Sequence, residues 1–175
     1  SGEYAVEEKV TSYLDLAPGE DEVYSSFKYN IRRQIRIGGE NGVVIKRGGI
    51  ELLDDFQEVY YTNMRRLGSP PQPRAFFETF ISDWANGEAT IFCAYINDRP
   101  IGSAFLLSYG KIIENCWAGT LTEYNKLYVP YLLYWEMIKY SVGKGYKAFS
   151  FGRSSKGSGS LKFKNHWKPI IKQIY

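Results

Sequence analysis

One stretch near the C-terminus, residues 149–167, constrains the fold more than any other part of the chain. It begins as a short apolar run that fits a buried strand, passes through a loop rich in glycine and serine, and ends with helical spacing. Leu161 and Lys164 share one stripe of that helix, and Phe163 and Trp167 share another. Backbone N–H groups gather at such a helix start, so the stretch indicates either an anion-binding site or a plain strand-to-helix turn.

Charge is distributed unevenly along the sequence. From residue 144 onward there are eight Lys or Arg residues and no Asp or Glu, whereas residues 1–58 hold twelve acids and seven bases. This asymmetry predicts a positive field at one end of the fold. Such a field would attract phosphates or other polyanions.

A chain of 175 residues fits one domain, residues 1–175, which could also be one excised lobe of a larger protein. Cys93 and Cys116 both lie in apolar runs, which predicts unpaired thiols in a reducing compartment. With no signal peptide and no apolar run long enough to span a bilayer, we expect the cytoplasm, with the inner membrane face as an option. The single histidine, His166, and the lack of a CxxC motif argue against any metal site.

Hydrophobic periodicity and turn signals give an order of secondary-structure elements. In the first half we predict a strand at 11–16, a helical turn from 20, a helix at 30–36 ended by Gly38 and Gly39, a strand at 43–45, and helices at 51–67 and 74–85. A meander of strands at 89–96, 100–109 and 111–118 follows. The last part holds a nearly buried helix opened by Pro130, a strand at 146–151, a short helix, and a last strand at 170–174. The helical crossover before 146–151 favours parallel pairing with a neighbouring strand. The fold class is therefore α+β, a mixed sheet flanked by helices.

Several motifs resemble a known family. They are residues 131–138, 145–147, 149–154 and 159–167, with weaker matches at 30–42 and 64–68. Together with the order of elements, they resemble the GCN5-related acyltransferase (GNAT) fold, and more closely its FemAB-type branch of peptidoglycan-bridge aminoacyltransferases. Many members of that branch have two such lobes, so a second lobe or a homo-oligomer is an expected partner.

The resemblance implies an N-acyltransferase that forms an amide on an amine-bearing acceptor, a cell-envelope or polysaccharide precursor. It implies a phosphate-bearing acyl donor as co-substrate, either aminoacyl-tRNA or acyl-CoA, and no tightly bound cofactor. It assigns stabilisation of the developing oxyanion to Lys164, with Phe163 packing beneath it. Arg153, at the end of its strand, could bind a phosphate in bidentate fashion or pair with a carboxylate, and it is the second catalytic candidate.

The substrate-binding candidates lie at strand ends and helix starts around these two cations. They are Trp117, Tyr128, Tyr131, Ser154, Phe163, Arg33 and Arg36, although arginines on a short helix are more often simply solvated. If strands 111–118 and 146–151 diverge at their C-terminal ends, the gap exposes backbone groups that need a ligand or water. We expect a positive cleft there, bordered by Trp117, Tyr128, Tyr131, Arg153 and Lys164, with both cations on one wall. The alternative is a closed sheet filled by Trp117 and Phe151.

Two other functions are weighed against this one. A coenzyme-A-dependent N-acetyltransferase shares the fold, but residues 120–130 contain no glycine and Pro130 removes a donor, which disfavours a pyrophosphate at that helix start. A non-catalytic anion- or nucleic-acid-binding module would use the basic C-terminal face. No general base is evident, and a nucleophilic pair of Cys116 and His166 lacks an acid to orient it.

Overall fold

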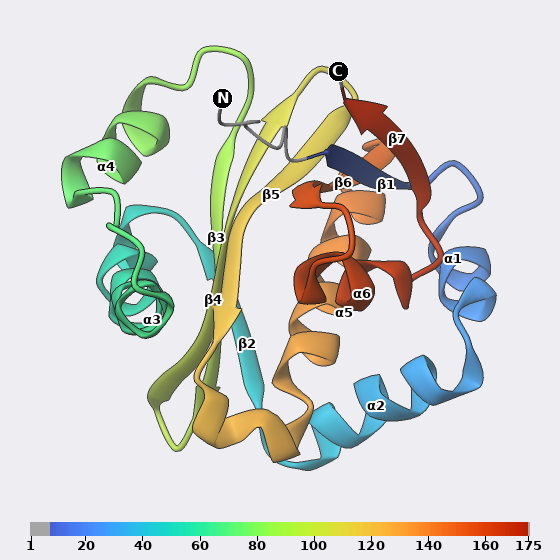
Figure 1. Cartoon of the computed structure of the whole chain (residues 1–175), viewed down its shortest axis with the longest axis horizontal. Coiled ribbons are helices and arrows are strands. Elements are labelled where there is room, and N and C mark those ends of the chain that lie inside the picture. The colour runs from blue at the N-terminus through green and yellow to red at the C-terminus, as the bar shows by residue number, and fades with distance from the viewer. Residues whose placement is uncertain (1–7, 175) are drawn as a thin grey trace, which may run out of the picture.

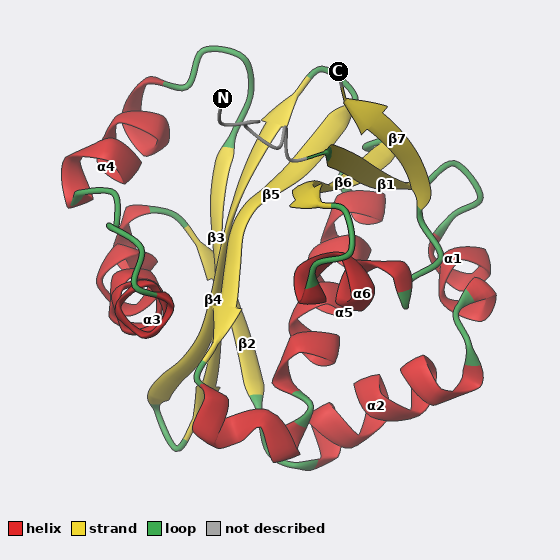
Figure 2. Ribbon diagram, viewed as in Figure 1, coloured by secondary structure: helices red, strands yellow, loops and turns green. Residues whose placement is uncertain are grey.

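The computed structural model describes residues 8–174, which form one seven-stranded sheet with helices on both faces (Figures 1 and 2). The strand order is β2-β3-β4-β5-β6-β1-β7, and among the strands of residues 8–174 only β5 and β6 pair in parallel. The strands are β1 (Lys9–Asp15), β2 (Val44–Gly48), β3 (Ala89–Ile96), β4 (Arg99–Tyr109), β5 (Ile112–Thr120), β6 (Ala148–Ser155) and β7 (Ile170–Ile174). The predicted mixed sheet is confirmed, and β3, β4 and β5 form the predicted meander.

The helices divide between the two faces of the sheet. Figure 1 shows α3 (Leu53–Leu67) and α4 (Arg74–Asp83) on one side, and α1 (Glu20–Ser26), α2 (Tyr29–Glu40), α5 (Val129–Gly143) and α6 (Gly159–Asn165) on the other. Each side has its own hydrophobic core. The core around α5 includes Phe149, Phe151 and Trp167, and the core beneath α3 includes Phe56 and Phe105. Between the two layers of helices, the sheet is buried on both faces along β3 and β4.

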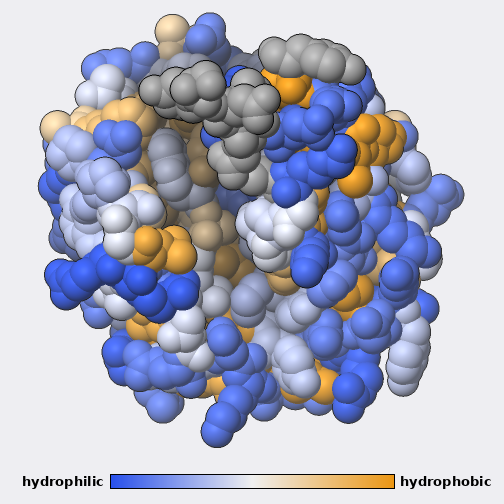
Figure 3. Space-filling model, viewed as in Figure 1, coloured by the Kyte–Doolittle hydropathy of each residue, from blue (hydrophilic) through white to orange (hydrophobic). Residues whose placement is uncertain are grey.

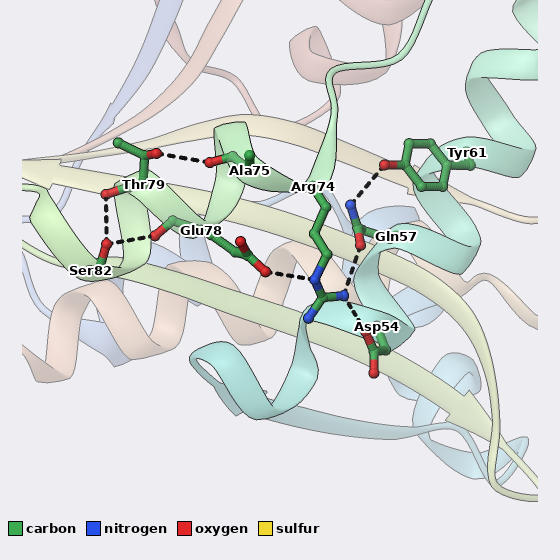
Figure 4. Close-up of polar contacts among 8 residues, drawn as sticks. All are labelled: Asp54, Gln57, Tyr61, Arg74, Ala75, Glu78, Thr79 and Ser82. Carbon is green, nitrogen blue, oxygen red and sulfur yellow. Dashed lines mark hydrogen bonds and ion pairs between the residues drawn. The ribbon is translucent and has the colours of Figure 1, made fainter.

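Helix α4 is held to α3 by the side chain of Arg74 (Figure 4). Its guanidinium donates to Gln57 Oε1 at 3.1 Å and to Glu78 Oε1 at 2.7 Å, and it also contacts the carboxylate of Asp54. Gln57 in turn donates to the hydroxyl of Tyr61 at 2.8 Å. These contacts fix the helical layer that lies over one side of β5.

Helix α2 is longer than the sequence pattern predicts. It runs through Gly38 and Gly39 to Glu40, whereas we expected the two glycines to end it. The reason is a close approach between helices, because a Cβ on Gly38 would lie 3.0 Å from the Cβ of Leu132 on α5. Gly38 is therefore a packing residue of a continuous helix rather than a terminator.

Strand β6 also continues past its predicted end at Phe151. The pattern of glycine and serine predicted a loop, but β1 pairs with this segment as far as Ser155. The pairing of β1 with β6 shifts by one residue between Thr11 and Tyr13 of β1, and this shift marks a β-bulge. Gly152 adopts φ 77°, a left-handed conformation that glycine accepts readily, and so lets the strand bend without ending.

The parallel pairing that we expected between β5 and β6 is confirmed, but it is short. It joins Ile112 to Ala148, Ile113 to Phe149 and Glu114 to Ser150, and it stops there. Beyond this point β5 stays with β4, with a register shift at Cys116, while β6 stays with β1. The two strands therefore separate at their C-terminal ends.

Cys93 and Cys116 are free thiols, as predicted. Within residues 8–174, none of the helices is both long enough and apolar enough to cross a bilayer.

Candidate active site

A cavity of about 280 Å³ lies where β5 and β6 separate. Its walls come from α3, from the C-terminal half of β5, and from β6 together with α6. Figure 3 shows the surface hollowed between the α3 side and the α6 side, with apolar residues at its floor. Its lining includes Phe56, Tyr60, Asn63, Ser103, Asn115, Cys116, Trp117, Tyr134, Phe151, Arg153 and Lys164.

Lys164 is the buried cation of this cavity. It projects from α6 and is only 7% exposed. Its Nζ donates to Ser154 Oγ at 2.7 Å and to the carbonyl oxygen of Arg153 at 3.4 Å. An ammonium has three N–H donors, so this geometry leaves one for a group inside the cavity.

Burial changes the acidity of this lysine. Removal from water disfavours the charged form and lowers the pKa of Lys164 to about 8, while the charge of Glu114 acts in the opposite direction. Lys164 therefore changes between ammonium and amine at a lower pH than an ordinary surface lysine, near pH 8. Perturbed groups of this kind are concentrated at functional sites.

Gly152 shapes the floor of the gap. A Cβ on this residue would lie 2.9 Å from the carbonyl oxygen of Asn115 on β5. Its N–H donates to Ser150 Oγ at 3.1 Å, and that hydroxyl donates to Glu114 Oε1 at 3.0 Å. The bend in β6 thus brings two backbones together just where the strand ladder ends.

Arg153 lines the same cavity as Lys164, and its backbone carbonyl accepts a hydrogen bond from the lysine. Arg153 is exposed, whereas Ser154 is buried and holds Lys164. Both cations therefore border one cavity, and their joint approach to a substrate stays a prediction.

Of the predicted substrate-binding residues, Trp117 lines the cavity, and Ser154 accepts a hydrogen bond from Lys164. Tyr128 and Tyr131 were expected at the cleft and are not among its lining residues. The ring of Tyr131 instead packs against Phe163 (centroid separation 5.3 Å) and Trp167 (6.2 Å), because the start of α5 lies against the loop after α6. Phe163 packs on Tyr134 at 5.0 Å, in the core next to Lys164.

Arg33 and Arg36 do not line the cavity either. They border a shallow depression on α2 with Tyr24 and Tyr29, and Arg36 forms an ion pair with Glu40 at 2.9 Å. The solvated role that is usual for arginines on a short helix fits this arrangement better than contact with the cavity.

Two contributions to the cavity were not predicted from the sequence. One is Asn115, which is 4% exposed and whose Nδ2 donates to the buried Tyr134 hydroxyl at 3.0 Å. The other is Asn63 of α3, whose amide, turned to face β5, donates to the carbonyl of Thr120 at 3.2 Å and accepts from its N–H at 3.3 Å. The Asn63 amide thus pairs with the backbone N–H and carbonyl of Thr120 at the edge of β5, where β6 no longer pairs with that strand. A buried asparagine in an apolar strand was the signal that could have been used.

The cysteine alternative is not supported. Burial raises the pKa of Cys116 to about 12, so this residue remains a thiol rather than a nucleophilic thiolate. His166 is exposed at the end of α6 and does not line the cavity. Among residues 8–174, His, Cys, Asp and Glu form no group of three or more suited to a metal ion.

The basic end of the chain is less open than its composition predicts. Lys156 pairs with Glu8 at 2.8 Å and Lys144 pairs with Glu88 at 3.5 Å, while Lys164 is buried. The start of α6 is capped by Ser158, whose Oγ accepts from the N–H of Leu161. Three of the eight cations from residue 144 onward are thus paired or buried, while Lys147, Arg153, Lys162, Lys168 and Lys172 are exposed.

The mixed sheet with its separated strand pair defines the class of protein. A family profile for the acetyltransferase (GNAT) domain matches residues 25–168, and the chain belongs to this family. Within this family, the relatives described next resemble the FemAB-like branch that the sequence motifs indicated. A UDP-N-acetylmuramoylpentapeptide-lysine N(6)-alanyltransferase of Weissella viridescens is 27% identical over 140 residues, 79% of this chain and 38% of that protein.

Solved structures show the same fold. FemX superposes with a TM-score of 0.82 at 15% identity, over 93% of this chain and 59% of that one. L-PGS from Bacillus licheniformis gives a TM-score of 0.66 at 13% identity, over 95% and 59%. An aminoglycoside acetyltransferase from an uncultured soil metagenomic sample, bound to sisomicin, gives 0.62 at 14% identity, over 78% and 94%. The chain thus spans about two fifths of the alanyltransferase and three fifths of FemX.

Proposed function

We propose that this chain is the catalytic half of a FemAB-like aminoacyltransferase, which forms an amide between an aminoacyl donor and an amine on a cell-envelope precursor. The observation that carries the proposal is Lys164, a buried cation held by Ser154 at the separation of two parallel strands. The alanyltransferase of Weissella viridescens, which acts on a lysine amine according to its name, supports the choice of acceptor.

The reaction needs charge stabilisation above all. When the amine attacks the acyl carbon, the carbonyl oxygen becomes an oxyanion, and a preorganised donor in a dry site stabilises it strongly. Lys164 has the third N–H for that oxygen, and its two other donors are fixed by Ser154 and the Arg153 carbonyl. A nitrogen–carbon bond forms, the carbon–oxygen ester bond of the donor breaks, and one amine proton passes to the released hydroxyl.

Arg153 has a separate role in this proposal. Its exposed guanidinium at the rim of the cavity suits a phosphate of either substrate, because guanidinium binds phosphate oxygens in bidentate fashion. Trp117 and Tyr60, on the opposite wall, offer aromatic surface to the transferred group.

The start of α5 favours a tRNA ester over coenzyme A as the donor. A pyrophosphate needs free backbone N–H groups and close approach at that helix end. Here a short 3-10 helix (Thr122–Leu127) leads into Tyr128, which adopts φ 54°, and α2 passes close by (Figure 1). A Cβ on Gly38 of α2 would lie 3.3 Å from the carbonyl oxygen of Tyr128. This packing leaves little room for a nucleotide.

The test is a transfer assay with the protein, labelled alanyl-tRNA and UDP-N-acetylmuramoyl-pentapeptide. Formation of the labelled amide, dependent on Lys164, is the expected result. Transfer from acetyl-CoA to a simple amine, with none from the aminoacyl ester, would contradict the proposal.

A further inference from the structure

We infer that the side-chain oxygen of Asn115 binds the attacking amine of the acceptor. Asn115 lines the cavity and is 4% exposed. Its Nδ2 is used by the Tyr134 hydroxyl, but its Oδ1 is buried with no hydrogen-bond partner among the described residues. A buried acceptor without a donor is unfavourable, so a ligand that supplies a donor at this point gains binding free energy.

Three other polar side chains of the cavity have hydrogen-bond partners within the protein. Ser103 Oγ donates to the carbonyl of Phe56 at 3.1 Å, and the Tyr60 hydroxyl accepts from the N–H of Gln72 at 2.9 Å. Asn63 bonds to the backbone of Thr120. The free acceptor of Asn115 is therefore not a general property of this surface.

Asn115 is connected to Lys164 by one packed set of side chains. Its amide bonds to Tyr134, and the Tyr134 ring packs against Phe163, with centroids 5.0 Å apart, next to Lys164 on α6. Tyr134 also stacks on Phe151 of β6. Since Asn115 and Lys164 both line the cavity, a substrate can contact the two residues at once.

The electrostatics of the lining select a neutral primary amine. No Asp or Glu is among the residues that line the cavity within the described part of the chain, and Lys164 contributes a positive charge. The nearby carboxylate of Glu114, which acts on Lys164 in the opposite direction, accepts a hydrogen bond from Ser150 Oγ behind the lining. A like charge and burial both lower the pKa of an amine, so the bound amine loses its proton. One of its N–H groups then donates to Asn115 Oδ1, and its lone pair remains free to attack the acyl carbon.

This inference rests on the proposed function for its geometry. Two substrates of the proposed reaction carry a primary amine that could bind at Asn115. One is the lysine side-chain amine of the acceptor, which we assign here, and the other is the α-amine of the aminoacyl group. Two matched pairs of probes distinguish them. Nα-acetyl-lysine amide is compared with Nα-acetyl-norleucine amide, and alaninamide is compared with propionamide.

The measurement is an NMR titration of the protein and its variants with each probe, following the backbone amide resonances of residues that line the cavity, such as Cys116 and Gly152. We expect the lysine probe to bind about tenfold more tightly than the norleucine probe. Binding of the lysine probe should strengthen as the pH rises toward the pKa of the free amine, ~10.4. Equal affinity for the two probes, or binding that weakens over this range, would overturn the inference.

Variants separate this role from a structural one. The double variant Asn115→Leu, Tyr134→Phe removes both hydrogen-bonding partners and keeps an apolar pair of similar shape, so it should fold while losing the tenfold preference. Asn115→Asp keeps an acceptor and should keep the preference. Loss of binding in Asn115→Asp would instead indicate that Nδ2 binds a substrate carbonyl, and would overturn the inference.

The outcomes are independent of the transfer assay. Amine-selective binding that depends on Asn115, in a protein without transfer activity, would contradict the proposed function and leave the amine site standing. If the double variant retained full transfer activity, the amine site would be contradicted and the proposed function would stand. Dependence on Asn115 for alaninamide alone would overturn the assignment to the acceptor amine.

Discussion

The ammonium nitrogen of Lys164 lies 2.7 Å from the hydroxyl oxygen of Ser154, so the buried lysine is fixed by the strand that forms one wall of the cavity. Helix α6 and strand β6 therefore act as one unit. The hydroxyl is a neutral partner, which positions the cation without neutralising it. Its positive charge remains available to a substrate.

Lys164→Ala should reduce the transfer rate by about 100- to 1,000-fold, because it removes a donor from the developing oxyanion. Lys162→Ala is the matched control, since Lys162 lies on the same helix but is exposed. Steady-state kinetics with alanyl-tRNA will measure both. Equal rates for the two variants would show that the buried lysine is not catalytic.

The rate should depend on pH through Lys164. Because burial lowers its pKa to about 8, the stabilising cation is lost as the pH rises through that value. Deprotonation of the acceptor amine acts in the opposite direction, so the useful quantity is the ratio of wild-type activity to that of Lys164→Arg, which stays charged. We expect this ratio to fall above about pH 8, and a flat ratio would contradict the assignment.

Gly152→Ala should destabilise the fold more than Gly157→Ala. Both glycines have positive φ, 77° and 79°, so both substitutions incur the conformational strain of that region, about 1 kcal/mol or more. Only at Gly152 does the new Cβ also meet a backbone oxygen, that of Asn115 at 2.9 Å. Urea denaturation will compare the two variants, and equal losses would mean that the close approach at the cavity floor is easily relieved.

Substitutions at the two glycines of α2 should have opposite effects. A Cβ on Gly39 would meet no neighbouring atom within 4 Å, so Gly39→Ala should stabilise the helix by about 0.5–1 kcal/mol. Gly38→Val should destabilise the protein, since its side chain would push α2 away from Leu132. Thermal unfolding of the pair gives the sign directly. A stabilising Gly38→Val would show that the helices are loosely packed.

Acetyl-CoA should bind weakly, because the start of α5 lacks a glycine-rich turn and lies against α2. Isothermal calorimetry is expected to give no binding in the micromolar range. Micromolar affinity would favour a coenzyme-A-dependent acetyltransferase, and the proposed donor would have to be abandoned.

Local patterns predicted the fold well because each element carries its own periodicity. The strand at 89–96 and the last strand at 170–174 have the predicted bounds, and the meander and the parallel pair were also predicted. The errors occur where tertiary contacts override local signals. Gly38 lies within a helix because another helix packs on it, and β6 continues past Gly152 because β1 pairs with it.

The candidate site was only partly predictable. Lys164 and Trp117 lie where the motif and the strand ends indicated, at the separation of β5 and β6. Tyr128 and Tyr131 do not, because a position near a helix start does not determine which way an aromatic ring packs. Asn115 was missed, since only the three-dimensional structure shows that one of its amide atoms is bonded and the other is free.

The position of β1 between β6 and β7 determines when the cavity can form during synthesis. Lys9 pairs with Ser155 and with Ile174, so the first described strand must wait for residues translated about 150 positions later. The meander of β3, β4 and β5 has local contacts and can form earlier, while closing such a long loop slows folding. A nascent chain therefore acquires α3 and β5 first and the wall that holds Lys164 last. The lining of the cavity is complete only after β6 and α6 have emerged from the ribosome.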